Sequence, residues 1–240
     1  MFPALWIRRW ADRKWTTRKD SNPNVDPDRW DPEPRWPAVI AVLSVGGLYL
    51  ALPSDLTVGP FWLFPAVIGV LIVPTVVSHR TGRHHIDRIL GFIITSLVTI
   101  VMVVSVFLLI SALPSHKQSP PALLRSAALL WLTNILVFAL WYWRLDAGGP
   151  HGRDARPGHS EGAFLFPQMT MSTQAKVAAG QRLWSPNFLD YLFLAFNTST
   201  AFSPTDTAPL ARWGKILMML QSLISLTVLA LLAARAVNIL

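Results

Sequence analysis

A cluster of oxygen-bearing side chains near the end of the chain has the residue types and spacing that could bind inorganic cations. A carboxylate stands at each end of it, Asp190 and Asp206. Hydroxyl, amide and carboxylate oxygens can replace the water around an ion, and such groups at membrane depth usually face a bundle interior or a water-filled path. The candidate ion-path residues are Asp190, Asn197, Thr198, Thr200, Ser203, Thr205 and Asp206, with Gln221 from the next apolar run.

The same residues also allow a structural interpretation. Ser and Thr hydroxyls pack between membrane helices and donate hydrogen bonds to backbone carbonyls. Asp206 follows Pro204 and is suited to capping the next turn. Gln221 is a polar side chain in the middle of an apolar run, where it either lines a path or bonds to a neighbouring helix.

The rest of the sequence offers no constellation for catalysis. The chain has no cysteine, which removes disulfides, thiolate chemistry and Cys-based metal sites. We find no phosphate-binding glycine loop, no His-Glu-x-x-His and no Ser-His-Asp arrangement. The histidines near Asp87 lack the spacing of a metal site. We therefore expect no enzyme activity, no cofactor, and no catalytic or metal-binding residues.

Long apolar helices are the elements that would position the cluster. Of the 240 residues, 52% are apolar and 14% are charged, whereas a soluble domain has about 25% charged residues. Uncharged runs of about 20 residues are long enough to cross a bilayer as helix. The sequence therefore predicts an all-α, polytopic transmembrane bundle. Its apolar runs are 36–52, 58–77, 89–113, 121–143, 186–204 and 213–237.

Lys and Arg alternate in number between the segments that separate these runs. Because cytoplasmic segments carry the excess of Lys and Arg, the alternation predicts a cytoplasmic N-terminus. The basic residues flank apolar runs, so the net charge of +8 indicates the lipid bilayer as partner and not nucleic acid. The counts are eight, none, three, one and five in residues 1–35, 53–57, 78–88, 114–120 and 144–185.

These patterns divide the chain into four segments. The charge count puts residue 185 inside the cell. The charge alternation favours a short fifth span at 186–204 and about six spans in all. If residues 186–204 instead re-enter as a pore helix, the chain has five spans and needs an external N-terminus or an external C-terminus. The segments are a basic cytoplasmic head with a Pro-rich linker (1–35), a four-helix transmembrane unit (36–143), a cytoplasmic loop (144–185), and a pore-like hairpin with the final transmembrane helix (186–240).

The order of features around the hydroxyl cluster resembles a known module. An aromatic-rich run, two threonines one residue apart, an aspartate, a proline and a Gly-Lys pair follow one another as Asp190–Phe196, Thr198, Thr200, Asp206, Pro209 and Gly214-Lys215. This order resembles, without a gap, the pore module of potassium channels. The resemblance implies a pore helix, a filter and the start of an inner helix.

The filter itself departs from that family. Potassium channels read Thr-Val-Gly-Tyr-Gly there, and this chain has Ala-Phe-Ser-Pro-Thr at 201–205. The two glycines let the backbone point successive carbonyls at the ion. Ser203 and Thr205 lack that freedom, and Pro204 fixes φ near −65°. The resemblance therefore implies a pore element without the usual potassium-selective carbonyl filter.

A second resemblance covers residues 120–240. It rests on the motifs at 141–150, 164–167, 188–191, 201–206 and 233–240. They are similar to a group of uncharacterised bacterial membrane proteins that share a domain of unknown function and are predicted to have five or six spans. The group carries no established activity. Membership implies a multi-pass protein of the bacterial plasma membrane.

Three functions remain open at this point. The first is a channel-like homo-oligomer whose path for inorganic ions is lined by the last two helical segments. The second is a non-conducting membrane scaffold or regulatory protein, in which the hydroxyl cluster packs within one protomer. The third is a small secondary transporter, which should show an internal repeat; residues 36–113 and 121–237 show no convincing similarity.

Overall fold

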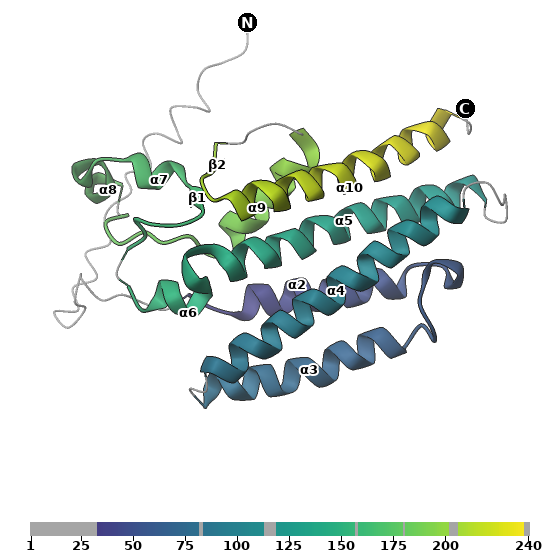
Figure 1. Ribbon diagram of the computed structural model, residues 1–240, viewed down its shortest axis with the longest axis horizontal. Helices are drawn as coiled ribbons and strands as arrows, with labels where there is room; N and C mark the ends of the chain where they lie inside the picture. Colours follow the sequence, from purple (N-terminus) through teal and green to yellow (C-terminus); the bar gives the residue numbers. More distant parts are fainter. Residues whose placement is uncertain are drawn as a thin grey trace, which may run out of the picture. The chain divides into compact units, whose positions relative to one another are not determined.

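A computed structural model describes residues 33–81, 84–112, 119–156, 158–179, 181–201 and 206–237. The basic head lies outside these residues except for 33–35, and so do Ser203 and Thr205. The described part is mostly helical, as the sequence predicts (Figure 1). Its longer helices are α2 (Trp36–Leu50), α3 (Leu63–Arg80), α4 (His84–Ala112), α5 (Pro120–Leu145) and α10 (Arg212–Val237).

Short elements connect these helices. The turn η1 (Ser54–Leu56) follows α2, and a 3-10 turn, η3 (Asp146–Gly148), follows α5. The stretch between α5 and α10 contains α6 (Gly149–Asp154), β1 (Phe164–Leu165), α7 (Pro167–Thr170), α8 (Thr173–Ala178), α9 (Phe188–Ala201) and β2 (Ala208–Pro209).

Among the described residues, three helical stretches are long enough and apolar enough to cross a membrane. They are His85–Ala112, Pro121–Asp154 and Arg212–Ala234. The helices Trp36–Leu50 and Leu63–Ser78 are apolar but shorter. The expected count of about six spans is therefore not confirmed by length and composition.

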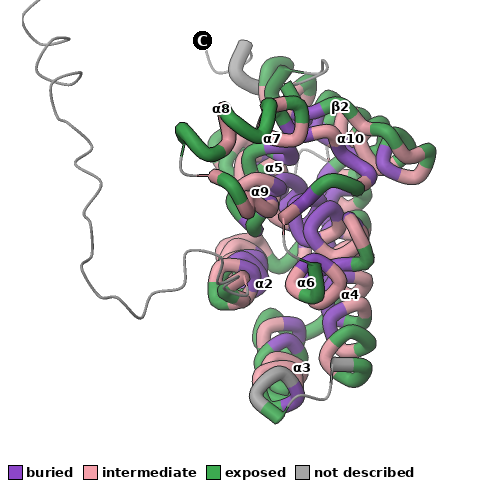
Figure 2. The backbone as a smooth tube through the Cα atoms, turned by 90° about the vertical axis from the view of Figure 1, so that its left-hand side faces the viewer, coloured by how far each residue is buried: buried purple, intermediate pink, exposed green. Residues whose placement is uncertain are grey.

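Helix α5 is the centre of the bundle. It packs against α2, α4, α9 and α10, whereas α3 packs against α2 and α4 at the edge. The burial pattern follows this arrangement, with the buried parts of the backbone facing α5 (Figure 2). Phe138, Leu140 and Tyr142 of α5 lie in the largest buried cluster. We call the end at which α2 and α4 begin and α5 ends the head end.

Helices α9 and α10 run parallel to each other. Near their starts, Phe164 contacts both Tyr191 of α9 and Trp213 of α10, with ring centroids 6.5 and 5.8 Å away. Eight residues further along each helix, Gln221 Nε2 donates to Ser199 Oγ at 2.7 Å. The same offset at both points means that the two helices advance in the same direction.

The chain just before α10 is held at the head end. There β2 pairs with β1 in antiparallel register, Leu165 with Ala208. Leu210 N then donates to Ala163 O at 2.7 Å. Because Tyr191 and Trp213 contact the same ring next to β1, α9 and α10 both start at the head end. A segment that simply crossed the bundle would leave α10 antiparallel to α9.

Candidate functional site

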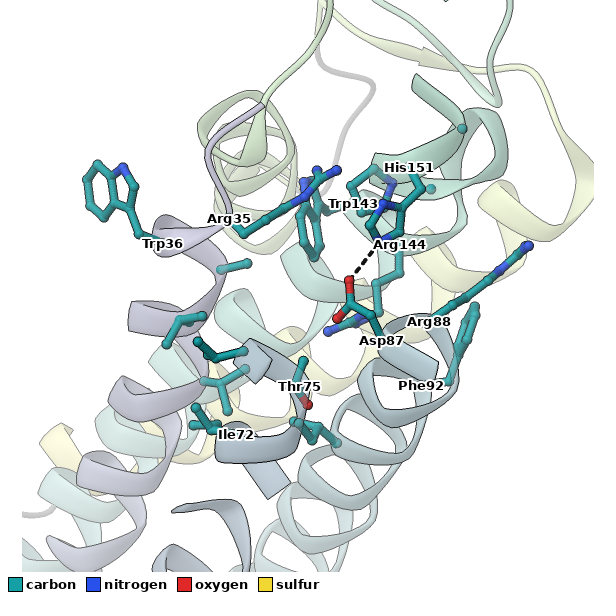
Figure 3. Close-up of a pocket in the computed structure, with 18 of the residues that line it drawn as sticks. Arg35, Trp36, Ile72, Thr75, Asp87, Arg88, Phe92, Trp143, Arg144 and His151 are labelled. Carbon is teal, nitrogen blue, oxygen red and sulfur yellow. Dashed lines mark hydrogen bonds and ion pairs between the residues drawn. The ribbon is translucent and has the colours of Figure 1, made fainter. Parts of the chain in front are cut away.

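A cavity of about 760 Å³ lies at the head end. Residues of α2, α3, α4, α5 and α6 line it, with arginine, histidine and aspartate side chains gathered at one end and aliphatic side chains below them (Figure 3). Asp87 Oδ2 and His151 Nε2 lie 2.6 Å apart in this cluster. Sequence patterns place Asp87 in a short connection between two apolar runs and give no sign that α6 covers it.

A tight turn after α5 creates the polar side of the head end. Ala147, Gly148 and Gly149 have φ values of 52°, 83° and 80°, a region that glycine enters at little cost. A Cβ at Gly149 would lie 2.7 Å from the carbonyl oxygen of Arg144. The turn therefore needs glycine there, and it folds α6 back over the end of α5.

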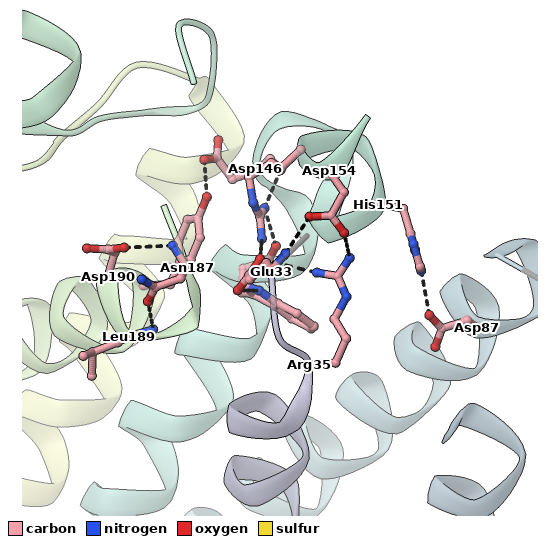
Figure 4. Close-up of polar contacts among 12 residues, drawn as sticks. Glu33, Arg35, Asp87, Asp146, His151, Asp154, Asn187, Leu189 and Asp190 are labelled. Carbon is pink, nitrogen blue, oxygen red and sulfur yellow. Dashed lines mark hydrogen bonds and ion pairs between the residues drawn. The ribbon is translucent and has the colours of Figure 1, made fainter. Parts of the chain in front are cut away.

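Arg153 of α6 is the buried cation that this turn delivers. Its guanidinium donates to the carbonyl oxygens of Trp143 and Asp146, at 2.9 and 3.0 Å, and to Glu33 Oε2 at 3.0 Å. It also lies 4.9 Å from the ring centroid of Tyr191. A cation is favoured at the C-terminal end of a helix, and here it bonds to the carbonyls of Trp143, near the end of α5, and of Asp146, just beyond it. Figure 4 shows Glu33, Arg35 and Asp154 close together beside this end of α5.

Residues just before α2 complete the pairing. Arg35 forms ion pairs with Asp154 and with Glu33, and the backbone N–H of Glu33 donates to Asp154 Oδ1 at 3.0 Å. Trp143 Nε1 donates to Glu33 Oε1 at 2.7 Å. Burial lowers the pKa of Arg35 below its ordinary value, although Asp154 and Glu33 act in the opposite direction.

Asp146 ties α9 and the loop before β1 to this group. Its carboxylate accepts hydrogen bonds from Tyr191 Oη at 2.6 Å and from Ala163 N at 2.5 Å. His159 Nε2 lies 3.7 Å from Asp146 Oδ2. Burial lowers the pKa of His159; Asp146 raises it, and nearby arginines lower it further. We call Glu33, Arg35, Asp146, Arg153, Asp154, His159 and Tyr191 the head-end network.

Gln221 is the centre of a second buried polar group, made of neutral side chains. Its Oε1 accepts from Tyr142 Oη at 2.5 Å, and its Nε2 donates to Ala195 O and Ser199 Oγ, both at 2.7 Å. Asn134 Nδ2 donates to the backbone carbonyl oxygen of Gln221 at 3.2 Å and to Ser225 Oγ at 3.0 Å. These contacts join α5, α9 and α10. We call Asn134, Tyr142, Ser199, Gln221 and Ser225 the Gln221 node.

The other predicted ion-path residues separate into buried and exposed ones. Thr198 is buried, and its Oγ1 donates to Leu194 O at 2.8 Å. Thr200 is exposed and Asn197 half-buried. Among the described path residues, Thr198 and Gln221 lie next to each other, through Ser199 and through Ser222 Oγ, which donates to Thr198 O at 3.3 Å, and Thr200 Oγ1 donates to Asn197 O at 3.3 Å.

The two carboxylates do not stand at opposite ends of the segment. Asp190 Oδ2 accepts from Asn187 N at 2.8 Å, and Asn187 Oδ1 accepts from Leu189 N at 2.8 Å. This is the reciprocal capping of a helix start. Asp206 is exposed and lies two residues before β2, so it returns toward the end at which Asp190 begins α9. The two carboxylates stand at the two ends of the hydroxyl cluster in the sequence, whereas in the structure both lie toward the start of α9.

Sequence reasoning missed the head-end network and the cavity. In the sequence, Arg144 and Arg153 count as basic residues of a cytoplasmic loop, and Asp146 only as part of the motif at 141–150. The Gly-Gly-Pro turn at 148–150 was the available signal that the chain doubles back there. In the part of the chain that the structure describes, no group of three His, Cys, Asp or Glu side chains could hold a metal ion. Comparison with family models, curated proteins and solved structures found no match to this chain.

Proposed function

We propose that this protein is a channel-like homo-oligomer of the bacterial plasma membrane with a re-entrant pore segment. Its N-terminus is cytoplasmic, α2, α3, α4, α5 and α10 cross the bilayer, and α9 enters and leaves from the cytoplasmic side. The alternation of basic residues supports this topology, because the arginine-rich head end becomes the cytoplasmic end. The C-terminus is then external, and residues 186–204 do not cross.

The observation that carries the proposal is the parallel arrangement of α9 and α10. A short helix that stops inside the bundle, a returning segment and a long helix in the same direction make up a re-entrant pore element. Helix α9 has 14 residues and α2, which we take to cross, has 15, so helix length does not distinguish them; the direction of α10 relative to α9 does. Irregular backbone at membrane depth is tolerated where protein or a water-filled path surrounds it, and residues 202–206 are hydroxyl-rich.

The structure divides the candidate path residues into two roles. Thr198 and Gln221 are buried inside one protomer, where their hydrogen bonds hold α9 against α10 and α5. They are therefore positioning residues. Asp190 is half-buried and caps α9. Asn197 is half-buried and Thr200 and Asp206 are exposed, and these three, with Ser203 and Thr205, are the ones that a path between protomers would use for inorganic ions.

An oligomer is needed because the buried side chains of Thr198, Ser199 and Gln221 occupy the space between α9, α10 and α5 within one protomer. Helix α10 carries an exposed apolar stripe with steps of three and four residues, formed by Ile216, Met219, Leu223 and Leu226. This spacing is the one with which helices pack along a seam. Packing of α10 against its copies would bring the polar ends of α9 around a common axis.

A specific observation favours a second candidate, a non-conducting scaffold or regulatory protein. In the described part of the hydroxyl cluster, Thr198 and Ser199 are buried and hydrogen-bonded within one protomer. A pore-like segment that no longer conducts ions would keep such contacts for stability alone. The two candidates share the topology and differ in ion flux.

The topology is tested with single cysteines, because the chain has none of its own. Glu161→Cys, Asp206→Cys and Ser119→Cys replace exposed residues and are labelled in intact cells and inverted vesicles with a membrane-impermeant maleimide. We expect positions 161 and 206 to react from the cytoplasmic side and position 119 from the outside. Reaction of position 206 from the same side as 119 would show that residues 186–204 cross.

Conduction is tested by reconstituting the full chain into liposomes and recording flux of Na⁺, K⁺ and Cl⁻ at both polarities. We expect cation flux that Asp206→Asn reduces, since a ring of carboxylates at a mouth concentrates cations. The matched control is Asp55→Asn, a carboxylate removed from η1 at the other end of the bundle. Absence of flux from the wild-type protein would reject the channel and leave the scaffold.

A further inference from the structure

The head-end cavity has features that neither a pore nor a scaffold requires. Three arginines, Arg35, Arg88 and Arg144, line it together with one aspartate, Asp87, and two histidines. Below them the walls are apolar, formed by side chains such as Val39, Val42, Ile72 and Val76. A volume of about 760 Å³ lies in the range of sites that hold an organic ligand.

Arg144 is a cation that points into this space and, among the described residues, hydrogen-bonds no carboxylate, although the charge of Asp87 acts on it. Its Nε donates to Thr95 Oγ1 at 2.8 Å, and its guanidinium lies 5.3 Å from the ring centroid of Trp143. Thr95 is the one acceptor that Arg144 reaches within the described ranges. The rest of its planar fork, which suits the oxygens of a phosphate or carboxylate, faces the cavity near Asp87 (Figure 3).

The guanidinium of Arg144 occupies the place that a side chain at Gly91 of α4 would take. A Cβ at Gly91 of α4 would lie 1.8 Å from Arg144 Nη1, so the guanidinium passes over α4 where a side chain is missing. A cation in the last turn of α5 is favoured by the helix dipole without such a gap. The gap is what directs Arg144 toward the cavity.

The opposing charges nearby are already engaged. Glu33 and Asp154 bind Arg35 and, for Glu33, Arg153 as well, and Asp87 lies 2.6 Å from His151. Arg35 Nε is buried and has no acceptor among the described residues. The polar end of the cavity therefore keeps an excess of positive charge.

The apolar part of the cavity opens sideways onto the surface of α2. Trp36 and Ile40 line the cavity, and their exposed fractions are 64% and 52%. A chain that lay between α2 and α3 could leave the cavity there and continue along the apolar outer face of the helices. A free inorganic anion would leave these walls unused.

We propose that this cavity binds an anionic phospholipid, with its phosphate at Arg144 and an acyl chain against α2 and α3. Basic pockets between transmembrane helices at the cytoplasmic side bind the head groups of such lipids. The assignment needs only that the helices lie in a membrane, and it does not depend on ion conduction.

The test uses the full chain, stripped of lipid in detergent and titrated with phosphatidylglycerol or phosphatidylcholine, with bound lipid counted by native mass spectrometry. We expect the wild type to prefer phosphatidylglycerol by about fivefold or more, the ratio that a contact of about 1 kcal/mol gives. Arg144→Gln should abolish the preference. Arg125→Gln removes an exposed arginine from the same helix at the other end and should leave it unchanged.

A second pair of variants keeps every charge. Gly91→Ala should displace the guanidinium of Arg144 and reduce the preference as Arg144→Gln does. Gly69→Ala adds the same methyl group to α3 where nothing lies within 4 Å and should have no effect. This pair decides the question even if Arg144→Gln does not fold.

Three results would overturn the proposal. One is equal binding of both lipids by the wild type. Another is an equal loss in each variant and its control. The third is binding of inorganic phosphate that depends on Arg144 while phosphatidylglycerol does not compete, which would identify the cavity as a site for a free anion.

Discussion

The head-end network and the Gln221 node are both buried and polar, but they are built from different kinds of groups. The head-end network holds formal charges, such as Arg153 and Asp146, where the bundle meets the connecting loops. The Gln221 node holds neutral amides and hydroxyls midway along α5 and α10. Charge is costly at membrane depth and neutral hydrogen bonds are less so. Among the described residues, the buried acidic and basic side chains, Asp146, Arg153 and His159, all lie at the head end.

The largest effect is expected from breaking the charged region at Arg153. Its side chain is 1% exposed in the ion pair with Glu33. Arg153→Met would remove one donor of that carboxylate and leave the carbonyls of Trp143 and Asp146 without the donor they have now. Removing one partner of a buried ion pair costs about 3–5 kcal/mol. We expect this loss in the free energy of unfolding, measured by denaturant titration in detergent micelles.

The control for Arg153 is Arg125→Met, at an exposed position of α5. A surface substitution of this kind changes stability by about 0.5 kcal/mol or less. Equal destabilisation by the two variants would mean that the head-end network contributes nothing specific. The comparison between the two regions would then be lost.

A substitution in the Gln221 node should lower the free energy of unfolding less than Arg153→Met does. Gln221→Leu keeps the volume roughly constant but leaves Tyr142 Oη and Ser199 Oγ without their partner. Side-chain hydrogen bonds between membrane helices contribute about 1–2 kcal/mol at most, so we expect a loss in that range. Ser222→Ala, which removes a longer contact of 3.3 Å to Thr198 O, is the matched control.

The pH dependence of the free energy of unfolding distinguishes the head-end network from the Gln221 node. The pKa of His159 is lowered in the folded protein, chiefly by burial, with Arg153 and Arg156 lowering it and Asp146 raising it. The unfolded chain therefore takes up a proton at higher pH than the folded chain does. Stability is present in full above the unfolded pKa of about 6.5 and falls as the pH drops below it.

This pH dependence is measured as the unfolding midpoint from pH 7.5 to 5. We expect His159→Gln to flatten the slope relative to the wild type and Gln221→Leu to leave it unchanged, because the Gln221 node has no group that titrates there. A slope that survives in His159→Gln would assign the effect to another histidine.

Much of the fold could be predicted from the sequence, because long apolar runs report helices directly. The run 121–143 became α5 and the run 213–237 became α10 with ends shifted by one or two residues. The course of residues 186–204 could not be predicted in this way. An apolar run has the same composition whether it crosses the bundle or turns back. What distinguishes the two courses is the pairing of two residues of β1 with two of β2.

The candidate site was predictable only in part, for a similar reason. The importance of Gln221 followed from its polarity within an apolar run, but its partners lie on two other helices. Arg144 gave no signal at all. Its direction depends on the missing side chain of Gly91, more than fifty residues away, and such long-range pairs are invisible to local patterns.

The smallest effect on stability is expected from the hydroxyls of α9, and it sharpens the division between positioning and path residues. Thr200→Val changes an exposed side chain whose Oγ1 bonds only to its own helix, at 3.0 Å to Phe196 O, so the free energy of unfolding should change by about 0.5 kcal/mol or less. Thr198→Val makes the same chemical change at a buried position and should destabilise more. Ion flux should show the reverse order, with a larger change for Thr200→Val, because an exposed hydroxyl can meet an ion and a buried one cannot. If Thr198→Val alters flux more than Thr200→Val, the path lies inside the protomer, and the Gln221 node would have to open to conduct.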